Sequence, residues 1–396
     1  MAEPPRSTDF TNRPLAEARL KVLNWLYPES FETRHLDISR RRRERTGEWL
    51  LKSPEFCEFV SNNQNSPILW GYGIPGAGKT FLSSAVISHL QIEARKNNYV
   101  VSYIYFNYKE QKQQKPLQIL ASLVKQLACR TSPLPSYIID LHTRLTKETK
   151  QPTEEELYSA LVSTLKSFGR VFFVFDALDE CDQTDQRRTL LPLFHRMVGE
   201  NPNIRIFLTS RQHPEDIQAS FEKSAKVELR ANDEDIKLYI QQKINENPRA
   251  KSLTSKGDRL NTIISELTKA ANGMFLLVHF HINLICQQTT PRKLMAELER
   301  LTLDGSRSKN NPLDPTYDRA IESIRSQPAD FELAKSIFTW LVKAQRTLTV
   351  NEIQIAVSME PDIRELEEDD LPSKKTLLDA CAGLVVIDEK SGIVRL

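Results

Sequence analysis

One segment combines the residue types that are needed to hold phosphate groups. Residues 73–80, GIPGAGKT, fit the pattern G-x-x-x-x-G-K-[ST]. Glycines let backbone amides turn toward an anion, Lys79 supplies a compact positive charge for β- and γ-phosphates, and Thr80 offers a hydroxyl to magnesium. The chain has only 12 glycines, and four of them gather here: Gly71, Gly73, Gly76 and Gly78. We predict a phosphate-binding loop, and the competing interpretation is an ordinary strand–helix turn.

Acidic residues follow the most hydrophobic predicted strand of the chain. The run RVFFVFD ends in Asp176, and Asp179 and Glu180 come three and four residues later. A carboxylate at the carboxyl end of a strand in an open α/β sheet lies beside the phosphate site, where it can hold magnesium. A second carboxylate there can orient or deprotonate an attacking water. The competing interpretation is a buried strand that simply ends in an acidic loop.

A basic residue ends the next predicted strand. Residues 209–211 read Thr-Ser-Arg, and the guanidinium of Arg211 could sense a γ-phosphate. An exposed arginine after a strand is the alternative.

The segments around these residues alternate between strand and helix patterns. We expect strands at residues 67–72, 99–106, 170–176, 203–210 and 226–229, and helices at 15–26, 46–51, 79–96, 117–128, 154–167 and 186–198. Near-continuous apolar strands separated by helices predict a parallel sheet with helices on both faces.

After residue 232 the pattern becomes helical. Helices are expected at 233–245, 258–271, 274–287 and, shorter, 294–301, then a polar linker at 305–311, then helices at 331–344, 350–357 and 374–381. Two apolar strands around a charged loop at 384–396 predict a β-hairpin. Three helices followed by a hairpin are the arrangement of a winged-helix domain.

Composition excludes several classes of protein. Of 396 residues, 40% are hydrophobic, and the formal charge is 54 − 52 = +2, which argues against a disordered chain and a strongly basic nucleic-acid binder. Five widely spaced cysteines argue against a disulfide framework or a cysteine metal site. No apolar run is long enough to span a membrane, and the N-terminus has no apolar core of a signal peptide. We expect a cytoplasmic protein.

Taken together, these motifs resemble the NACHT class of STAND signalling NTPases, in particular the fungal type with a nephrocystin-like module. The matching segments are residues 45–51, 73–80, 176–180, 209–211 and 271–276, with residues 340–352 and 381–385 similar to the winged-helix part. Ala177, after the magnesium aspartate, and the extra acids Asp179 and Glu180 are the most class-specific of these residues. The resemblance covers roughly residues 20–396.

The resemblance implies an α/β P-loop NTPase fold that binds ATP or ADP with Mg²⁺. It implies a sheet order in which one strand separates the phosphate-loop strand from the Asp176 strand. The predicted nucleotide-binding residues are Gly73, Ile74, Pro75, Gly76, Ala77, Gly78, Lys79, Thr80 and Phe81, together with Thr46 and Gly47, which lie where the family's N-terminal segment approaches the adenine. Thr80 and Asp176 are the predicted magnesium ligands. Glu180, Asp179 and Arg211 are the predicted catalytic residues.

Four parts are expected along the chain. These are an N-terminal arm and short helix over residues 1–30, a NACHT P-loop NTPase core over 31–231, an all-α helical domain over 232–312 and a winged-helix domain over 313–396. The chain ends at Leu396, before a His-bearing segment that follows in the family. Neither a sensor array nor an effector domain is recognised, so we expect the switch module alone or a fragment of a longer receptor.

The predicted function is a switch of the NOD-like receptor type, in which ATP/ADP binding and slow hydrolysis control self-association. Other signalling proteins are further expected partners, often through repeat or effector domains absent from this chain. Magnesium-dependent nucleoside-triphosphatase activity is left open. A turnover P-loop ATPase or kinase and a nucleotide-free scaffold remain as alternatives.

Two weaker signals favour structural roles. The basic run at residues 40–45 could bind nucleic acid or anionic lipid, but a solvated face or a phosphate contact is the preferred interpretation. His279 and His281 stand two apart, a poor spacing for a metal pair on a helix.

Overall fold

The computed structural model describes residues 13–61, 67–307, 314–325, 328–359, 367–381, 384–387 and 391–395. The chain divides into two compact units. The first, called the α/β unit here, comprises Met1–Leu36, Leu50–Tyr72 and Ser83–Val227; the second, called the helical unit, comprises Asp37–Trp49, Gly73–Leu82 and Glu228–Leu396. The chain therefore passes between units on both sides of residues 73–82.

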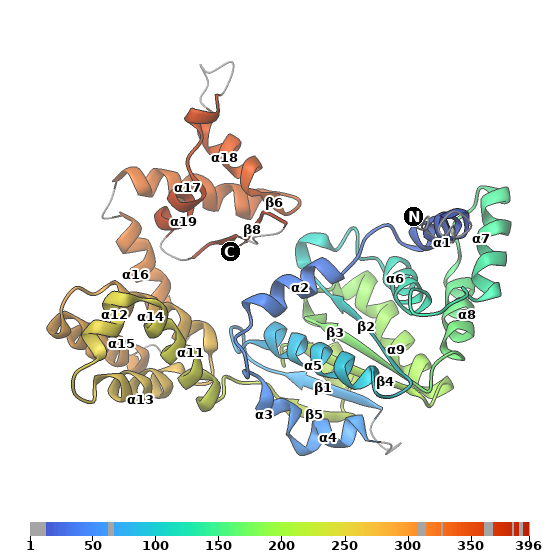
Figure 1. Ribbon diagram of the computed structural model, residues 1–396, viewed down its shortest axis with the longest axis horizontal. Coiled ribbons are helices and arrows are strands. Elements are labelled where there is room, and N and C mark those ends of the chain that lie inside the picture. The colour runs from blue at the N-terminus through green and yellow to red at the C-terminus, as the bar shows by residue number, and fades with distance from the viewer. Residues whose placement is uncertain are drawn as a thin grey trace, which may run out of the picture. The chain divides into compact units, whose positions relative to one another are not determined.

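The α/β unit is built on a five-stranded sheet with the order β2-β3-β4-β1-β5 (Figure 1). The strands are β1 Ile68–Tyr72, β2 Tyr99–Tyr105, β3 Arg170–Asp176, β4 Ile204–Ser210 and β5 Ala225–Glu228. Strands β1 to β4 pair in parallel. Strand β4 lies between β1 and β3, so the sheet order that the family resemblance implied is confirmed.

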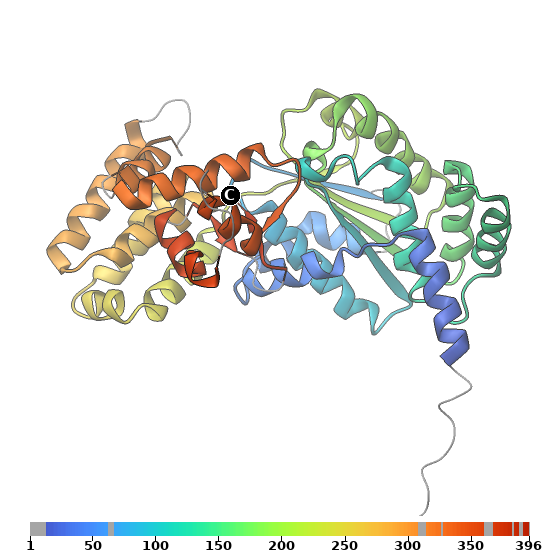
Figure 2. The ribbon, with the colours of Figure 1, turned by 90° about the horizontal axis from the view of Figure 1, so that it is seen from above.

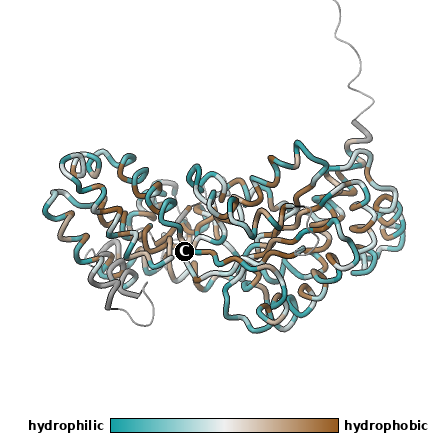
Figure 3. The backbone as a smooth tube through the Cα atoms, turned by 90° about the horizontal axis from the view of Figure 1, so that it is seen from below, coloured by the Kyte–Doolittle hydropathy of each residue, from teal (hydrophilic) through white to brown (hydrophobic). Residues whose placement is uncertain are grey.

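Helices lie on both faces of this sheet (Figure 2). The helices between residues 13 and 220 are α1 Arg13–Leu26, α2 Glu32–Arg41, α3 Glu48–Leu51, α4 Pro54–Val60, α5 Lys79–Ala94, α6 Pro116–Ala128, α7 Ser136–Glu148, α8 Glu154–Leu165, α9 Arg188–Glu200 and α10 Glu215–Ser220. Helix α4 contacts β1, α6 contacts β2 and α9 contacts β4. This cover explains why every residue of β3 and β4 is buried, and hydrophobic segments run through the interior in Figure 3.

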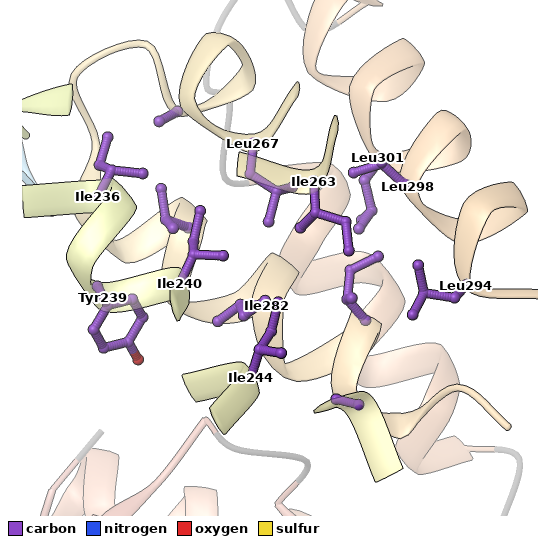
Figure 4. Close-up of a cluster of buried hydrophobic side chains, with 14 of the residues drawn as sticks. Ile236, Tyr239, Ile240, Ile244, Ile263, Leu267, Ile282, Leu294, Leu298 and Leu301 are labelled. Carbon is purple, nitrogen blue, oxygen red and sulfur yellow. The ribbon is translucent and has the colours of Figure 1, made fainter. Parts of the chain in front are cut away.

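The helical unit contains a bundle of five helices. These are α11 Asp233–Glu246, α12 Pro248–Thr254, α13 Arg259–Ala271, α14 Phe275–Gln287 and α15 Pro291–Arg307. Ile236 and Ile240 of α11, Ile263 of α13, Ile282 of α14 and Leu298 of α15 meet in one apolar core (Figure 4). Burial of these branched side chains, rather than helix propensity, holds such helices together.

The remaining described elements of this unit are four helices and a small sheet. They are α16 Asp314–Arg325, α17 Pro328–Lys343, β6 Leu348–Thr349, α18 Val350–Ser358, α19 Lys374–Ala380, β7 Val386–Ile387 and β8 Ile393–Arg395. Strand β8 pairs antiparallel with both β6 and β7. Thr349 caps α18 in a reciprocal capping box with Glu352, which fixes the start of that helix.

The expected strands and most expected helices occur within a few residues of their predicted bounds. The linker predicted over 305–311 is wrong in its first part, because α15 continues to Arg307; residues 308–311 lie outside the described residues. The predicted arm before residue 13 and part of the acidic run 360–370 also lie outside them. Helices α2, α4, α7, α10, α12 and α16 were not predicted.

Candidate phosphate-binding site and acidic strand end

The phosphate loop connects β1 to α5 in a conformation that glycine makes possible. Gly76 has φ +75° and Gly78 has φ +93°, a region that other residues rarely adopt. A Cβ at Gly73 would stand 2.1 Å from the carbonyl oxygen of Leu229, so no other residue fits there. At Gly78, such a Cβ would meet one atom within 4 Å among the described residues outside its chain neighbours, the Phe275 Cβ at 4.0 Å. The open backbone beside Gly78, at the start of a 16-residue helix, fits a bound anion.

Lys79 is the first residue of α5, and its ammonium group turns back to the loop. Its Nζ atom donates to the carbonyl oxygens of Gly73 and Ile74, each at 3.0 Å. One positive charge therefore stands within the turn that the glycines form. Ile74 is exposed, Ala77 is buried, and Phe81 is half-buried beneath the Arg41 guanidinium, 5.9 Å from the ring centroid.

The loop rests on the segment between α13 and α14. The amide of Leu276 donates to the carbonyl oxygen of Gly76 at 3.0 Å. A Cβ on Gly76 would lie 2.9 Å from Leu276 Cβ and 3.0 Å from Met274 Cγ. Asn272 and Gly273, at φ +46° and +79°, turn the chain into this segment. The phosphate loop and the bundle thus form one packed body.

Thr46 and Gly47, the predicted adenine-side residues, are held from two directions. The Gly47 amide donates to Asp235 Oδ2 of α11 at 2.8 Å, and Arg42 Nη1 donates to the carbonyl oxygen of Thr46 at 3.1 Å. Burial raises the pKa of Asp235, and the Gly47 amide opposes that rise. The approach of Thr46 and Gly47 to an adenine ring stays a prediction.

Most of the basic run 40–45 is engaged in contacts within the chain. Arg41 pairs with Asp37 at 3.5 Å, Arg43 pairs with Glu246 in a bidentate contact, and Arg45 lies 3.8 Å from Glu48. These arginines fasten the segment to its own helix and to α11, which favours the structural interpretation.

Asp176 ends β3 as a buried carboxylate with two hydroxyl donors. Ser83 Oγ donates to its Oδ1 at 2.6 Å, and Thr209 Oγ1 donates to the same atom at 2.8 Å. Thr209 Oγ1 also accepts the Ala177 amide at 3.0 Å. Hydrogen bonds to an ionised acceptor are stronger than neutral ones, so this arrangement fixes one oxygen and the rotamer of Asp176.

Asp179 and Arg211 form a pair that joins the ends of β3 and β4. The Arg211 amide donates to Asp179 Oδ1 at 3.1 Å, and its Nε lies 3.1 Å from Oδ2. The Asp179 side chain is 8% exposed and that of Arg211 is 56% exposed. Asp179 therefore orients Arg211, whose guanidinium remains accessible.

Glu180 is a half-buried acid that stands close to two other carboxylates. Burial raises its pKa, the amide of Tyr108 opposes that rise by donating to Oε2 at 3.2 Å, and the charges of Asp176 and Asp179 add to it. A carboxyl group with a raised pKa is better suited to take a proton than an ordinary glutamate.

The structure therefore groups the predicted residues in two sets. Glu180, Asp179, Arg211 and Asp176 gather at the carboxyl ends of β3 and β4, and residues 73–81 with Thr46 and Gly47 belong to the helical unit. The sequence analysis missed Ser83 and Asp235. Ser83 stands four residues after Lys79, the spacing of one helix face, which could have revealed it; Asp235 is 188 residues from Gly47 and gave no local signal.

This sheet order and loop define a nucleotide-binding module of the P-loop NTPase class. Residues 45–211 match the family model described as Nephrocystin 3, N-terminal. A curated relative, vegetative incompatibility protein HET-E-1 of Podospora anserina, is 25% identical over 355 residues, 87% of this chain and 25% of that protein. The two matches support a NACHT-like P-loop module. The chain spans about a quarter of the length of this curated relative.

Similar solved structures include two archaeal proteins. The Walker-type ATPase paby2304 of Pyrococcus abyssi has a TM-score of 0.41 and 13% identity, covering 90% of this chain and 94% of its own. The ORC2 protein of Aeropyrum pernix, in ADPNP–ADP complexes, has a TM-score of 0.40 and 11% identity, covering 100% and 91%. Within the described residues, no helix has the length and apolarity that a membrane crossing requires.

Proposed function

We propose that this protein is an ATP/ADP-dependent signalling switch in which nucleotide binding and slow hydrolysis control self-association. The main support is the packing of the phosphate loop on the helical bundle. Because Gly76 bonds Leu276 directly, a nucleotide that orders the loop also acts on the bundle. Such a coupling is what a conformational switch needs.

Each predicted residue has a role in this proposal. The backbone amides of residues 73–78 other than Pro75, together with Lys79, bind the phosphates, and Thr80 and Asp176 would hold Mg²⁺, which neutralises phosphate charge when bound. The serine that anchors Asp176, Ser83, stands on the same helix as Thr80. Glu180 activates water, and Asp179 orients Arg211 so that its guanidinium reads the γ-phosphate.

The finer assignments belong to the same proposal. We assign residues 1–30, 31–231, 232–312 and 313–396 to the arm, the NTPase core, the helical domain and a winged-helix domain. The sheet β6-β8-β7 with α17 to α19 supports the last assignment. The Podospora relative supports a fungal, NOD-like type, and the cytoplasm is the proposed location.

The direct test is to identify the nucleotide that the purified protein retains. Denaturation should release ADP or ATP in near-stoichiometric amount from the wild type and little from Lys79→Ala, and mass spectrometry identifies the released nucleotide. Lys96→Ala, just beyond the same helix and paired only with Glu93 in the contacts described, is the matched control and should retain nucleotide. Light scattering should show a mass change on ADP–ATP exchange that Lys79→Ala lacks.

Two results would contradict the switch. If Lys79→Ala leaves both nucleotide content and oligomeric state unchanged, the loop does not bind nucleotide, and a nucleotide-free scaffold becomes the better description. If the wild type turns over many ATP molecules per second without a change of mass, a turnover enzyme is the better description.

A further inference from the structure

Two segments that follow neighbouring strands are joined by the amide side chains of Gln111 and Gln186, and three buried amide side chains lie within these segments. Residues 107–114 follow β2, and residues 177–187 follow β3. Asn107, Gln114 and Gln186 are 6%, 3% and 3% exposed, and glutamine is rarely buried so completely. Of these three side chains, that of Gln186 bonds across to the other segment, whereas those of Asn107 and Gln114 bond within residues 105–114.

Gln186 is the central residue of this connection. Its Nε2 atom donates to the carbonyl oxygens of Gln111 at 2.6 Å and Gln114 at 3.0 Å. Its Oε1 atom accepts the amide of Asp182 at 2.7 Å. One side chain therefore binds the loop after β2 and the loop after β3 at the same time.

Gln111 completes the connection at Glu180. Its Nε2 atom donates to the Glu180 carbonyl oxygen at 2.7 Å, while the amide of Tyr108 donates to the Glu180 carboxylate at 3.2 Å. Gln114 fixes the base of the loop, because it accepts the Asn107 amide and donates to the carbonyl oxygen of Tyr105. Both the main chain and the carboxylate of Glu180 are thus held by the loop after β2.

We propose that Gln111 and Gln186 are positioning residues for the hydrolytic step, which hold the loop after β2 against Glu180 and so fix the place of its carboxylate. This inference rests on the proposed function, since it concerns the group that activates water there. Neither glutamine contacts the reacting atoms in this proposal; both act through Glu180.

The physical reason is that a general base must be both placed and charged. A free glutamate side chain samples several rotamers, and a displacement of about 1 Å can lower a rate by about a hundredfold. Burial and the charges of Asp176 and Asp179 raise the pKa of Glu180, and the Tyr108 amide and the charge of Arg34 oppose that rise. If the loop moved away, the carboxylate would lose that donor and take up a proton at higher pH.

The test compares single-turnover hydrolysis and nucleotide affinity in the full chain. Gln111→Met and Gln186→Met keep side-chain volume and remove the amide groups. We expect a rate lower by about tenfold or more, an unchanged Kd for ATP, and an acid limb of the pH–rate profile that moves to higher pH. Gln126→Met is the matched control, because Gln126 bonds both backbone atoms of Tyr103 on the same strand, away from Glu180; its rate should stay close to that of the wild type.

Hydrogen exchange gives a readout that does not depend on turnover. The Tyr108 amide should exchange faster in Gln111→Met, in Gln186→Met and in Glu180→Ala than in the wild type or in Gln126→Met. Unchanged exchange in both glutamine variants overturns the inference.

The kinetic outcomes separate the two levels of the proposal. If Glu180→Gln hydrolyses ATP as fast as the wild type, the role of Glu180 in the proposed function fails, and this inference falls with it. If Glu180→Gln is slow but both glutamine variants keep the wild-type rate and pH profile, only this inference fails. A loss of rate that matches an equal loss of ATP affinity also overturns it, since that would show general misfolding.

Discussion

A single strained residue marks the end of β3. Ala177 has φ +59° and ψ +49° and is buried, and its amide donates to the hydroxyl of Thr209 that also holds Asp176. A residue other than glycine in this left-handed region costs on the order of 1 kcal/mol or more, and a β-branched residue costs still more. The side chain at 177 is therefore limited to a small one by the backbone and not only by space.

From this strain we predict that two substitutions at position 177 differ in their effect on stability. Ala177→Val should lower the free energy of unfolding by roughly 2–3 kcal/mol, whereas Ala177→Gly should change it by less than about 1 kcal/mol, because relief of strain offsets the added chain entropy. Urea unfolding with hydrogen exchange of β3 amides measures both. Equal stability of the valine and glycine variants would show that the backbone at 177 is not restrained as described.

At the level of elements, α1 and α6 cap each other. Arg19 of α1 donates to the carbonyl oxygens of Ala128 and Cys129 at the end of α6, at 3.0 and 3.1 Å. Lys125 of α6 donates to those of Tyr27 at 2.6 Å and Glu29 at 3.3 Å, just beyond α1. Cations at helix C-termini satisfy free carbonyl groups and interact favourably with the helix dipole.

We predict that Lys125→Met releases α1. The loss of hydrogen bonds from a charged group costs about 1.5–3 kcal/mol, enough to open a helix that is held at one edge. Hydrogen exchange of residues 13–26 should accelerate by tenfold or more, as it should in Arg19→Met. Lys21→Met, an exposed lysine on the same helix, is the control, and an equal acceleration in this control would count against reciprocal capping.

A half-buried histidine, His279, makes the helical bundle sensitive to acid. Burial, followed by the charges of Lys243 and Arg41, lowers the pKa of His279 from 6.5 to about 4, and its Nδ1 atom lies 2.7 Å from the Tyr239 hydroxyl. The unfolded chain protonates His279 more readily than the folded chain does. The contribution of neutral His279 to the free energy of unfolding is therefore fully present above pH 6.5 and is lost as the pH falls toward 4.

The expected loss is about 2 kcal/mol between pH 7.5 and pH 5. It should be visible as faster hydrogen exchange of α11 and α14 at pH 5, after correction for the intrinsic rate. In His279→Gln the same comparison should be nearly flat, since no imidazole is left to titrate. A wild type and variant with the same pH dependence would remove His279 from this account.

The elements also show what the sequence could predict and where it failed. The strands β3 and β4 were predicted because the short apolar runs 171–175 and 206–208 are rich in β-branched and aromatic residues and are bounded by polar residues. Helix α2, ETRHLDISRR, was missed because its charged residues obscure the apolar period. Helix α7 was missed although Ile138, Leu141 and Leu145, all buried, have helical spacing. The sheet order came from the family resemblance, because local patterns contain no information about which strands are neighbours.

The candidate site was predictable to the same extent. The residues of the loop and of the strand ends form local motifs that the sequence alone suggests, and their roles stay predictions. Their supports come from distant segments: Asp235 for Gly47, Leu276 for Gly76 and Gln186 for the loop after β2. Such contacts depend on the tertiary fold, and neither spacing nor periodicity encodes them.

At the scale of the whole molecule, the division into units differs from the order of the chain. Residues 73–82 interrupt the α/β unit in sequence but group with the helical unit in space. Met274, which is 6% exposed, and Leu276 pack at Gly76. A ligand that binds only the folded loop stabilises the body that contains it, by about 2.7 kcal/mol at a concentration of 100 Kd.

We therefore predict that ADP slows hydrogen exchange of residues 272–277, as well as of the loop itself. The Leu276 amide should respond most, since it donates to Gly76, and Lys79→Ala should abolish the response. Met274→Ala should make the amides of residues 272–277 exchange faster with ADP bound, while the loop amides remain protected. Met295→Ala is the control, because Met295 of α15 packs against the bundle core, and it should leave the exchange of both segments unchanged. Protection confined to residues 73–82 in the wild type would mean that the bundle does not sense the nucleotide, and the coupling on which the proposed switch depends would be absent.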